Sequence, residues 1–218
     1  MKKPLLLISV LAIAALAPAQ KNYQLRINVK PGQTFKYTLK MRSNLMALQT
    51  DMSMKVATVQ NKLSTFHTSM GKTLLNGQPA QGSERLKNVL LITTMDSLGN
   101  VVKSEVKNAP NIGSMPDQTA IPFPKEAIKI GDTWTAQGTV QGQKVNTKYK
   151  LIAIKPVNGK NAAIIHAVPS SMAQVQPNGP IVFSVELATG MPISMKMTGQ
   201  ARQADGSKLN VEVTMNRG

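Results

Sequence analysis

The chain has 218 residues, no cysteine and a formal net charge of +16, from 26 Lys and Arg against 10 Asp and Glu. Without cysteine it has no disulfide, no thiolate metal site and no lipid-attachment cysteine, so its fold depends on the hydrophobic core. The charge favours anionic surroundings such as lipid headgroups or acidic envelope polymers. Aromatic residues are only 4% and no nucleic-acid-binding motif is present, so we expect no nucleic-acid partner.

Residues 1–19 have the order of a cleavable secretory signal. Lys2 and Lys3 precede an uncharged, mainly apolar run over residues 5–17, and Ala17-Pro18-Ala19 then places small residues at the cleavage site. As a helix the run spans about 20 Å, short of the roughly 30 Å hydrocarbon core, which disfavours a retained anchor. We therefore expect a soluble mature chain over 20–218, with charge +14, no transmembrane segment and no lipid anchor, in the periplasm or outside the cell.

From residue 25 onward, apolar residues alternate with polar ones, as in half-buried antiparallel strands. The alternation covers residues 25–29, 35–41, 89–94, 101–106, 145–154, 162–168, 183–187, 193–197 and 209–215. Asn158-Gly159 and Asp205-Gly206 are typical of hairpin turns. Residues 43–82 stay ambiguous, because residues 52–56 alternate like a strand whereas residues 61–71 could form a short helix.

These patterns predict an all-β fold, either an antiparallel curved sheet or an open or half β-barrel, in a single domain over residues 20–218. Prolines make residues 107–127 and 169–180 loops, since proline cannot donate a hydrogen bond to a ladder. The first loop is a Pro-rich connector between two possible repeats, residues 20–110 and 121–218.

A shared motif supports that repeat. Residues 29–35 and 128–134 both read apolar, Lys, any residue, Gly, polar amide or acid, Thr, aromatic. Gly32 and Gly131 supply the turn, and Phe35 and Trp134 enter the core at the start of the strand. Asp132 and Gly190 are expected to act in turns as well. Duplication and a chance similarity of turn chemistry both explain the match.

Residues 121–134, IPFPKEAIKIGDTW, and residues 186–192, ELATGMP, carry a resemblance to known proteins. They resemble the V-K-x-G-D-[ST]-W strand start and the D-x-x-T-G hairpin of a family of exported bacterial proteins of unknown function. The resemblance covers mainly residues 121–197. It implies an exported antiparallel β-protein, and it implies no reaction, no ligand and no catalytic residues.

No pattern indicates catalysis. The two histidines, His67 and His166, are far apart in the sequence, no G-x-S-x-G elbow is present and the acids are scattered. We therefore expect no catalytic residue, no bound metal and no cofactor. A secreted hydrolase ranks third among our hypotheses for function.

Methionine is abundant, with twelve in the mature chain. Met52 and Met54 share one face of a strand, and so do Met195 and Met197. Thioethers suit Cu(I), yet core packing or an adaptable apolar binding surface gives the same spacing. We predict that these four methionines contact an apolar or amphipathic ligand, if the protein has one.

Basic residues are predicted to lie on the outward face of the first two strands. If residues 25–30 and 35–42 are both strands, Arg26, Lys30, Lys36, Lys40 and Arg42 share the outward face, where their mutual repulsion favours an anionic partner. Lys148 and Lys150 extend the pattern. The leading hypothesis is an exported, non-catalytic binding module for an apolar or amphipathic ligand such as a lipid, with this basic face toward anionic envelope material. The alternative is a structural or interaction protein of the envelope without a small ligand.

Overall fold

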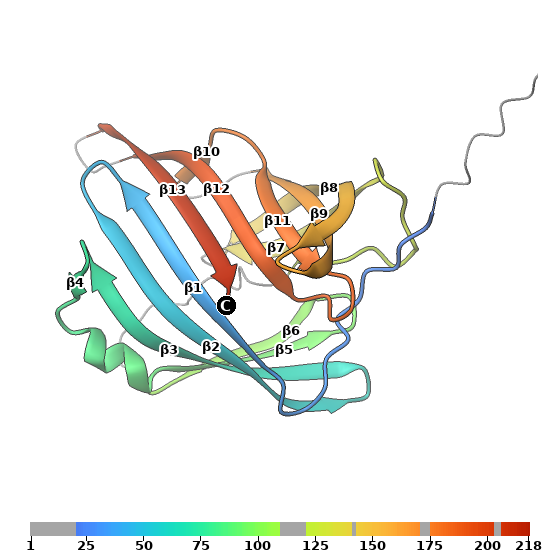
Figure 1. Ribbon diagram of the computed structural model, residues 1–218, viewed down its shortest axis with the longest axis horizontal. Coiled ribbons are helices and arrows are strands. Elements are labelled where there is room, and N and C mark those ends of the chain that lie inside the picture. Colours follow the sequence, from blue (N-terminus) through green and yellow to red (C-terminus); the bar gives the residue numbers. More distant parts are fainter. Residues whose placement is uncertain (1–20, 110–120, 141–142, 171–174, 203–205) are drawn as a thin grey trace, which may run out of the picture.

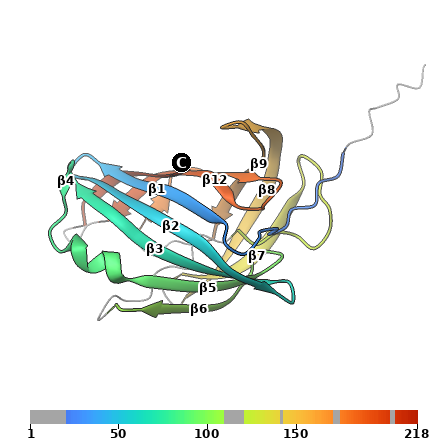
Figure 2. The same ribbon diagram turned by 60° about the horizontal axis from the view of Figure 1, so that its bottom comes forward.

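The computed structural model describes residues 21–109, 121–140, 143–170, 175–202 and 206–218. The expected signal peptide, much of the connector and Asp205 lie outside these residues. One antiparallel sheet runs in the order β6-β5-β3-β2-β1-β13-β12-β11-β9-β8-β7, with β10 beside β12 and β4 beside β3. Figures 1 and 2 show that the sheet curls without closing, with β1, β13 and β12 in the middle of its convex side. The expected all-β, open curved fold is confirmed.

The elements have the following bounds. They are β1 (Thr34–Ser43), β2 (Ala47–Gln60), β3 (Leu63–Leu75), β4 (Gln78–Pro79), the 3-10 helix η1 (Ser83–Asn88), β5 (Leu90–Asp96), β6 (Val101–Lys107), β7 (Thr133–Val140), β8 (Gln143–Val157), β9 (Lys160–Pro169), β10 (Val175–Pro177), β11 (Ile181–Glu186), β12 (Pro192–Arg202) and β13 (Lys208–Arg217).

Alternation of side chains gives the sheet an apolar concave face and a polar convex face. On β1, Phe35 and Tyr37 are buried on the concave side, whereas Lys36 between them is exposed. Two core clusters lie on that side. One centres on Leu151 of β8 and the other on Val56 of β2, both of which are fully buried.

The two ends of the concave face differ. The end that holds Phe35, Val56 and Leu151 is filled, and we call it the closed end. The opposite end, with the β1–β2 turn and the turn at Asn76 and Gly77, carries half-buried apolar residues, and we call it the open end. Figure 1 shows the β1–β2 turn and β4 together at the left of the molecule, which is the open end.

Residues 25–29 do not form the expected strand. Segment 22–30 makes only an isolated bridge between Tyr23 and Ile128, and it crosses the closed end as extended chain. Its alternation is real, because Leu25 is buried in one cluster and Val29 in the other. The apolar pattern therefore indicates burial, whereas a strand also needs a neighbouring strand to pair with its backbone. Here the backbone bonds to turns instead, since Ile27 N–H donates to Ser97 O and Asn28 N–H donates to Thr189 O.

The ambiguous stretch forms the long β2–β3 hairpin, so the helical alternative for residues 61–71 is wrong. Asn61 and Lys62 have φ of 50° and 64°, the left-handed geometry of a type I′ turn, which asparagine tolerates. The loop expected over residues 169–180 needs a smaller correction. Its residues Val175–Pro177 form the short edge strand β10 beside β12, where a terminal proline is compatible with pairing.

Matching hydrogen bonds recur at the starts of β1 and β7. In each case the turn glycine donates to the carbonyl of a buried residue on the next strand, and that residue's N–H donates back to the residue after the glycine. The contacts are Gly32 N to Val56 O at 2.8 Å and Val56 N to Gln33 O at 2.8 Å, then Gly131 N to Leu151 O at 2.7 Å and Leu151 N to Asp132 O at 3.0 Å. Both glycines have positive φ, as the turn requires.

Candidate functional site

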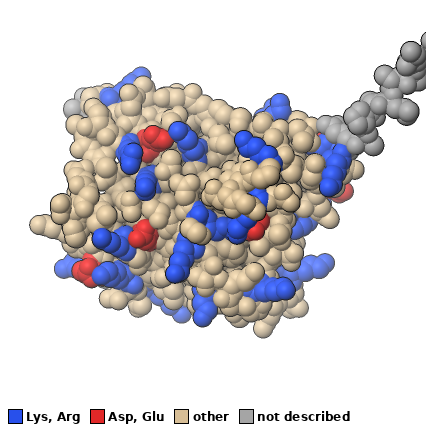
Figure 3. Space-filling model, in the orientation of Figure 1, with Lys and Arg blue, Asp and Glu red and all other residues tan. Residues whose placement is uncertain are grey.

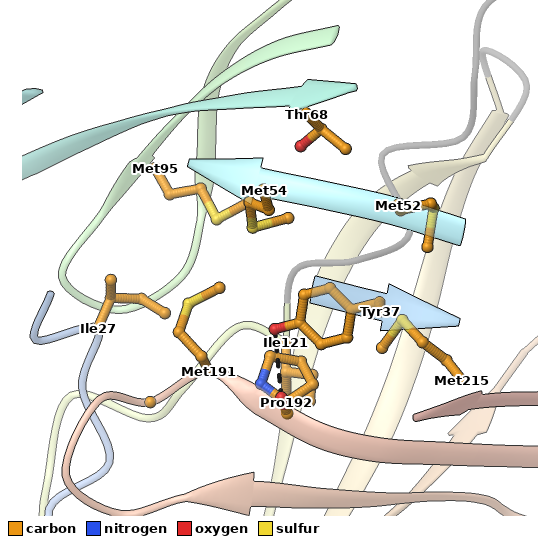
Figure 4. A pocket seen from close by; sticks show the side chains of 11 residues that line it. Ile27, Tyr37, Met52, Met54, Thr68, Met95, Ile121, Met191, Pro192 and Met215 are labelled. Atoms are coloured by element: carbon orange, nitrogen blue, oxygen red, sulfur yellow. Dashed lines mark hydrogen bonds between the residues drawn. The ribbon is translucent and has the colours of Figure 1, made fainter. Parts of the chain in front are cut away.

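A small cavity lies against the closed end of the concave face, and Figure 4 shows the side chains that line it. Five of the lining residues are methionines, from β2, β5, the β11–β12 turn and β13. They are Met52, Met54, Met95, Met191 and Met215. The cavity volume is about 20 Å³, which is room for about one water molecule, so no lipid-sized ligand fits there in this conformation.

The four methionines predicted as ligand contacts share the concave face. Met52 and Met54 line the cavity, whereas Met195 and Met197 lie on β12 outside its lining, with Met195 paired to the lining residue Met215. Met54 and Met197 are buried, and Met52 and Met195 are half-buried. Met95, Met191 and Met215 were not predicted. Met215 lies in the alternating pattern that predicted β13, but Met191 comes from a turn, where no periodicity marks the inward side.

Toward the open end the concave face carries a row of apolar side chains across five neighbouring strands. Register pairs Leu75 with Leu48, Leu48 with Met41, Met41 with Val213 and Val213 with Met197. Leu48, Met41 and Val213 are half-buried and belong to neither core cluster. Together with Met70 and Leu91, which are also half-buried, they leave accessible apolar surface inside the curve of the sheet.

A partly buried ion pair joins β13 to the end of β11 at the closed end. Arg217 Nη2 lies 2.8 Å from Glu186 Oε2, and Lys160 Nζ lies 3.4 Å from Glu186 Oε1. Burial by itself would raise the pKa of Glu186, but hydrogen bonds from Thr189 and Arg217 and the charges of Arg217 and Lys160 outweigh it and hold the pKa below its usual value.

The rest of the Arg217 guanidinium packs against the core. It lies over the Phe35 ring, 5.4 Å from its centroid, and its Nη1 has no partner among the described residues. Burial raises the pKa of Tyr37, the residue opposite Arg217, and its hydroxyl donates to the Pro192 carbonyl at 3.2 Å. These groups lie where β1 pairs with β13, in the middle of the sheet. We call this junction the seam, and these groups join the two halves of the sheet there.

The predicted basic face is only partly formed. Lys36, Lys40 and Arg42 lie on the convex side of β1, and none of them forms an ion pair with a described acid. Lys148 and Lys150 lie on the convex side of β8. Figure 3 shows Lys and Arg side chains spread over this side of the molecule, with few acids between them.

Arg26 and Lys30 do not join that face, because segment 22–30 is not a strand. The Arg26 guanidinium donates to the carbonyls of Leu25, Pro124 and Lys125, so it ties segment 22–30 to the connector. Lys30 lies in the turn before β1, where its N–H donates to Gln33 Oε1. The expectation that all five cations share one strand face was wrong at these two positions.

A second hollow opens on the convex side, with a volume of about 320 Å³. Small side chains on three neighbouring strands leave this space, among them Thr38, Ser53 and Ser69. Lys36 lies at its edge, and the one acid that lines it, Asp51, accepts a hydrogen bond from Thr38 Oγ1 at 3.0 Å. The hollow is shallow, and Lys36 and Asp51 are the charged side chains that line it.

The two histidines lie on the convex side, each opposite a lysine. His67 pairs with Lys55, and His166 pairs with Lys150. Neither imidazole forms an ion pair or a side-chain hydrogen bond with any described residue. Within the described ranges, no group of three or more His, Cys, Asp or Glu side chains gathers as a metal site would require.

Comparison with known proteins gives little further information. No family model matches the chain, and no curated protein matches it in sequence. A solved structure of a DUF1329 family protein from Desulfovibrio piger aligns with 88% of this chain and 85% of its own, at 8% identity and a TM-score of 0.31. That TM-score is too low to support a conclusion about the fold or function of this chain. Among the described residues, no helix has the length and apolar character needed to cross a membrane.

Proposed function

We propose that the protein is an exported, non-catalytic binding module that holds an apolar or amphipathic ligand, such as a lipid, on its concave face. The observation that carries this proposal is the half-buried apolar row at the open end, centred on Leu48, Met41 and Val213. A face that served only as core would be filled there as it is at the closed end. Side chains of methionine have three rotatable bonds and a polarizable sulfur, so the Met-rich surface adapts to ligands of different shape.

Export is part of the proposal, and it is supported by the signal-like sequence of residues 1–19. The cations of β1 that lack acidic partners would then face anionic envelope material, with Lys36 at the edge of the convex hollow. In this arrangement the two faces have separate roles. The concave face binds the ligand, and the convex face keeps the protein near an anionic surface by electrostatic attraction.

The test uses the mature chain secreted from its own signal peptide. Organic extracts of the purified protein are examined by mass spectrometry, and binding of the apolar fluorophore N-phenyl-1-naphthylamine is titrated. The double variant Met41→Gln/Val213→Thr should lose roughly tenfold in probe affinity, because it leaves polar groups unpaired against an apolar ligand. Val182→Thr on the convex side is the matched control and should bind as the wild type does. Absence of both a co-purified lipid and probe binding would reject the ligand.

A further inference from the structure

Exposed apolar side chains are concentrated at one place on the surface. Among the described residues, the large apolar side chains that are exposed are Leu45 (65%), Met46 (37%), Leu75 (42%), Val102 (60%), Ile130 (40%) and Val168 (54%). Leu45 and Met46 form the tip of the β1–β2 turn, and Leu75 ends β3 just before the next turn. Both turns lie at the open end, and Figures 1 and 2 show them together at the left of the molecule.

Hydrogen bonds fix the two turns to each other. Asn76 N–H donates to Ala47 O at 2.7 Å, and Ala47 N–H donates to Asn76 Oδ1 at 2.8 Å. Within the first turn, Ser43 Oγ accepts from the N–H groups of Leu45 and Met46, at 3.2 Å and 3.0 Å. These bonds hold the backbone of the two turns that carry Leu45, Met46 and Leu75.

Two cations lie on the same hairpins. Arg42 on β1 and Lys72 on β3 are exposed, and neither forms an ion pair with a described acid. Apolar side chains at a protruding tip, with unpaired cations a few residues behind them, match the interface of an anionic bilayer, where acyl chains lie below charged headgroups.

We propose that this tip, formed by Leu45, Met46 and Leu75, docks on an anionic lipid bilayer, with Arg42 and Lys72 against the headgroups. A protein partner fits less well. A stable protein interface needs about 800 Å² on each side, whereas three side chains on two turns make a narrow protrusion.

Docking in this way would place the open end against the lipid. Leu75 belongs both to the tip and to the concave apolar row, which continues from it through Leu48 to Met41. The tip and the proposed ligand surface are therefore continuous. Docking itself needs no ligand. Passage of a ligand between the bilayer and the concave face is a further step, and that step rests on the proposed function.

The experiment measures co-sedimentation of the mature protein with vesicles of phosphatidylcholine, with and without phosphatidylglycerol, at low and high salt. We expect binding to the phosphatidylglycerol vesicles that weakens as salt rises. Leu45→Ser/Met46→Ser should reduce the affinity about tenfold, through loss of inserted apolar surface. Val102→Ser is the control, because Val102 is equally exposed but lies at the start of β6, toward the closed end.

The possible outcomes distinguish insertion of the tip from binding of a ligand. Equal vesicle binding by the tip variant and the wild type would overturn tip insertion, and so would a wild type that binds neither vesicle. A Met46→Trp/Trp134→Phe variant adds a direct readout, since its emission comes from residue 46 and should shift to the blue on anionic vesicles and stay unchanged with neutral ones. Binding of the naphthylamine fluorophore in solution is measured in parallel. Vesicle binding without probe binding would reject the ligand and leave the docking site standing.

Discussion

Glu186 is the acid on which the seam of the sheet depends. It pairs with Arg217, whose side chain is only 4% exposed, and it accepts a hydrogen bond from Thr189 Oγ1 at 2.8 Å. Removing one partner of such a pair leaves the other charge uncompensated in the interior. The surface pair of Glu212 with Lys196 offers a contrast, because both side chains there are well exposed.

We expect Glu186→Gln to lower the free energy of unfolding at pH 7 by about 2 kcal/mol, because it weakens a hydrogen-bonded ion pair at a partly buried site. The pKa of Glu186 is depressed in the folded protein, so its contribution is complete above the unfolded pKa of about 4.3 and is lost as pH falls through the folded pKa. The difference between variant and wild type should therefore shrink in urea titrations below about pH 4. Glu212→Gln, the exposed control, should change stability by less than about 0.5 kcal/mol. A difference for Glu186→Gln that persisted unchanged into strong acid would contradict this role.

At the scale of the element, the contact between segment 22–30 and the β11–β12 turn holds the closed end together. Gly190 has φ of +70°, and a Cβ there would lie 2.1 Å from the Arg26 carbonyl oxygen. Gly159 in the β8–β9 turn has nearly the same φ, +73°, but a Cβ there would meet nothing within 4 Å. Substituting each glycine therefore separates the cost of backbone strain from the cost of losing close packing.

We expect Gly159→Ala to cost roughly 1–2 kcal/mol, the price of a left-handed conformation for alanine. Gly190→Ala should cost clearly more, because the turn must also move away from segment 22–30. Urea midpoints for the two variants test this, and limited proteolysis should cut segment 22–30 sooner in Gly190→Ala. Equal midpoints would mean that the turn and the segment are not tightly packed.

The sequence predicted the elements well where the backbone partner is local. The β11, β12 and β13 meander and the Asn158-Gly159 turn were found because alternation and turn chemistry both act over a few residues. Segment 22–30 was misassigned because burial gives the same alternation with or without a ladder. Arg26 was misplaced with it, since two of its three carbonyl partners, Pro124 and Lys125, are about a hundred positions away.

In the candidate site, too, local patterns were predictable from the sequence and contacts between distant residues were not. Met52, Met54, Met195 and Met197 were placed on one face from period-two spacing alone. The apolar row from Leu75 to Met197 could not be predicted, because it depends on the register of five strands. The exposed tip at Leu45 was also beyond reach, since sequence patterns do not show which apolar turn residues lack a neighbour.

At the scale of the whole molecule, matched contacts relate the two halves. The glycine turns before β1 and β7 make the same hydrogen bonds, and His67 and His166 each follow a fully buried residue and pair with a lysine on the preceding strand. We propose on these grounds that β1 to β6 and β7 to β12 are copies of one β unit. β13 lies between them and pairs with both β1 and β12, so the copies share one sheet.

Shared contacts decide whether these halves unfold as one. Ile27 packs against both core clusters, and the Arg217 guanidinium of β13 lies over the Phe35 ring of β1. We therefore expect a single cooperative transition. Trp134, the only tryptophan, stacks on Tyr149 with ring centroids 5.3 Å apart, so its fluorescence reports the second half alone, whereas circular dichroism reports all strands. The two urea curves should coincide. A tryptophan transition displaced from the dichroism curve would show that each half is a domain in its own right, joined only by the seam at β1 and β13.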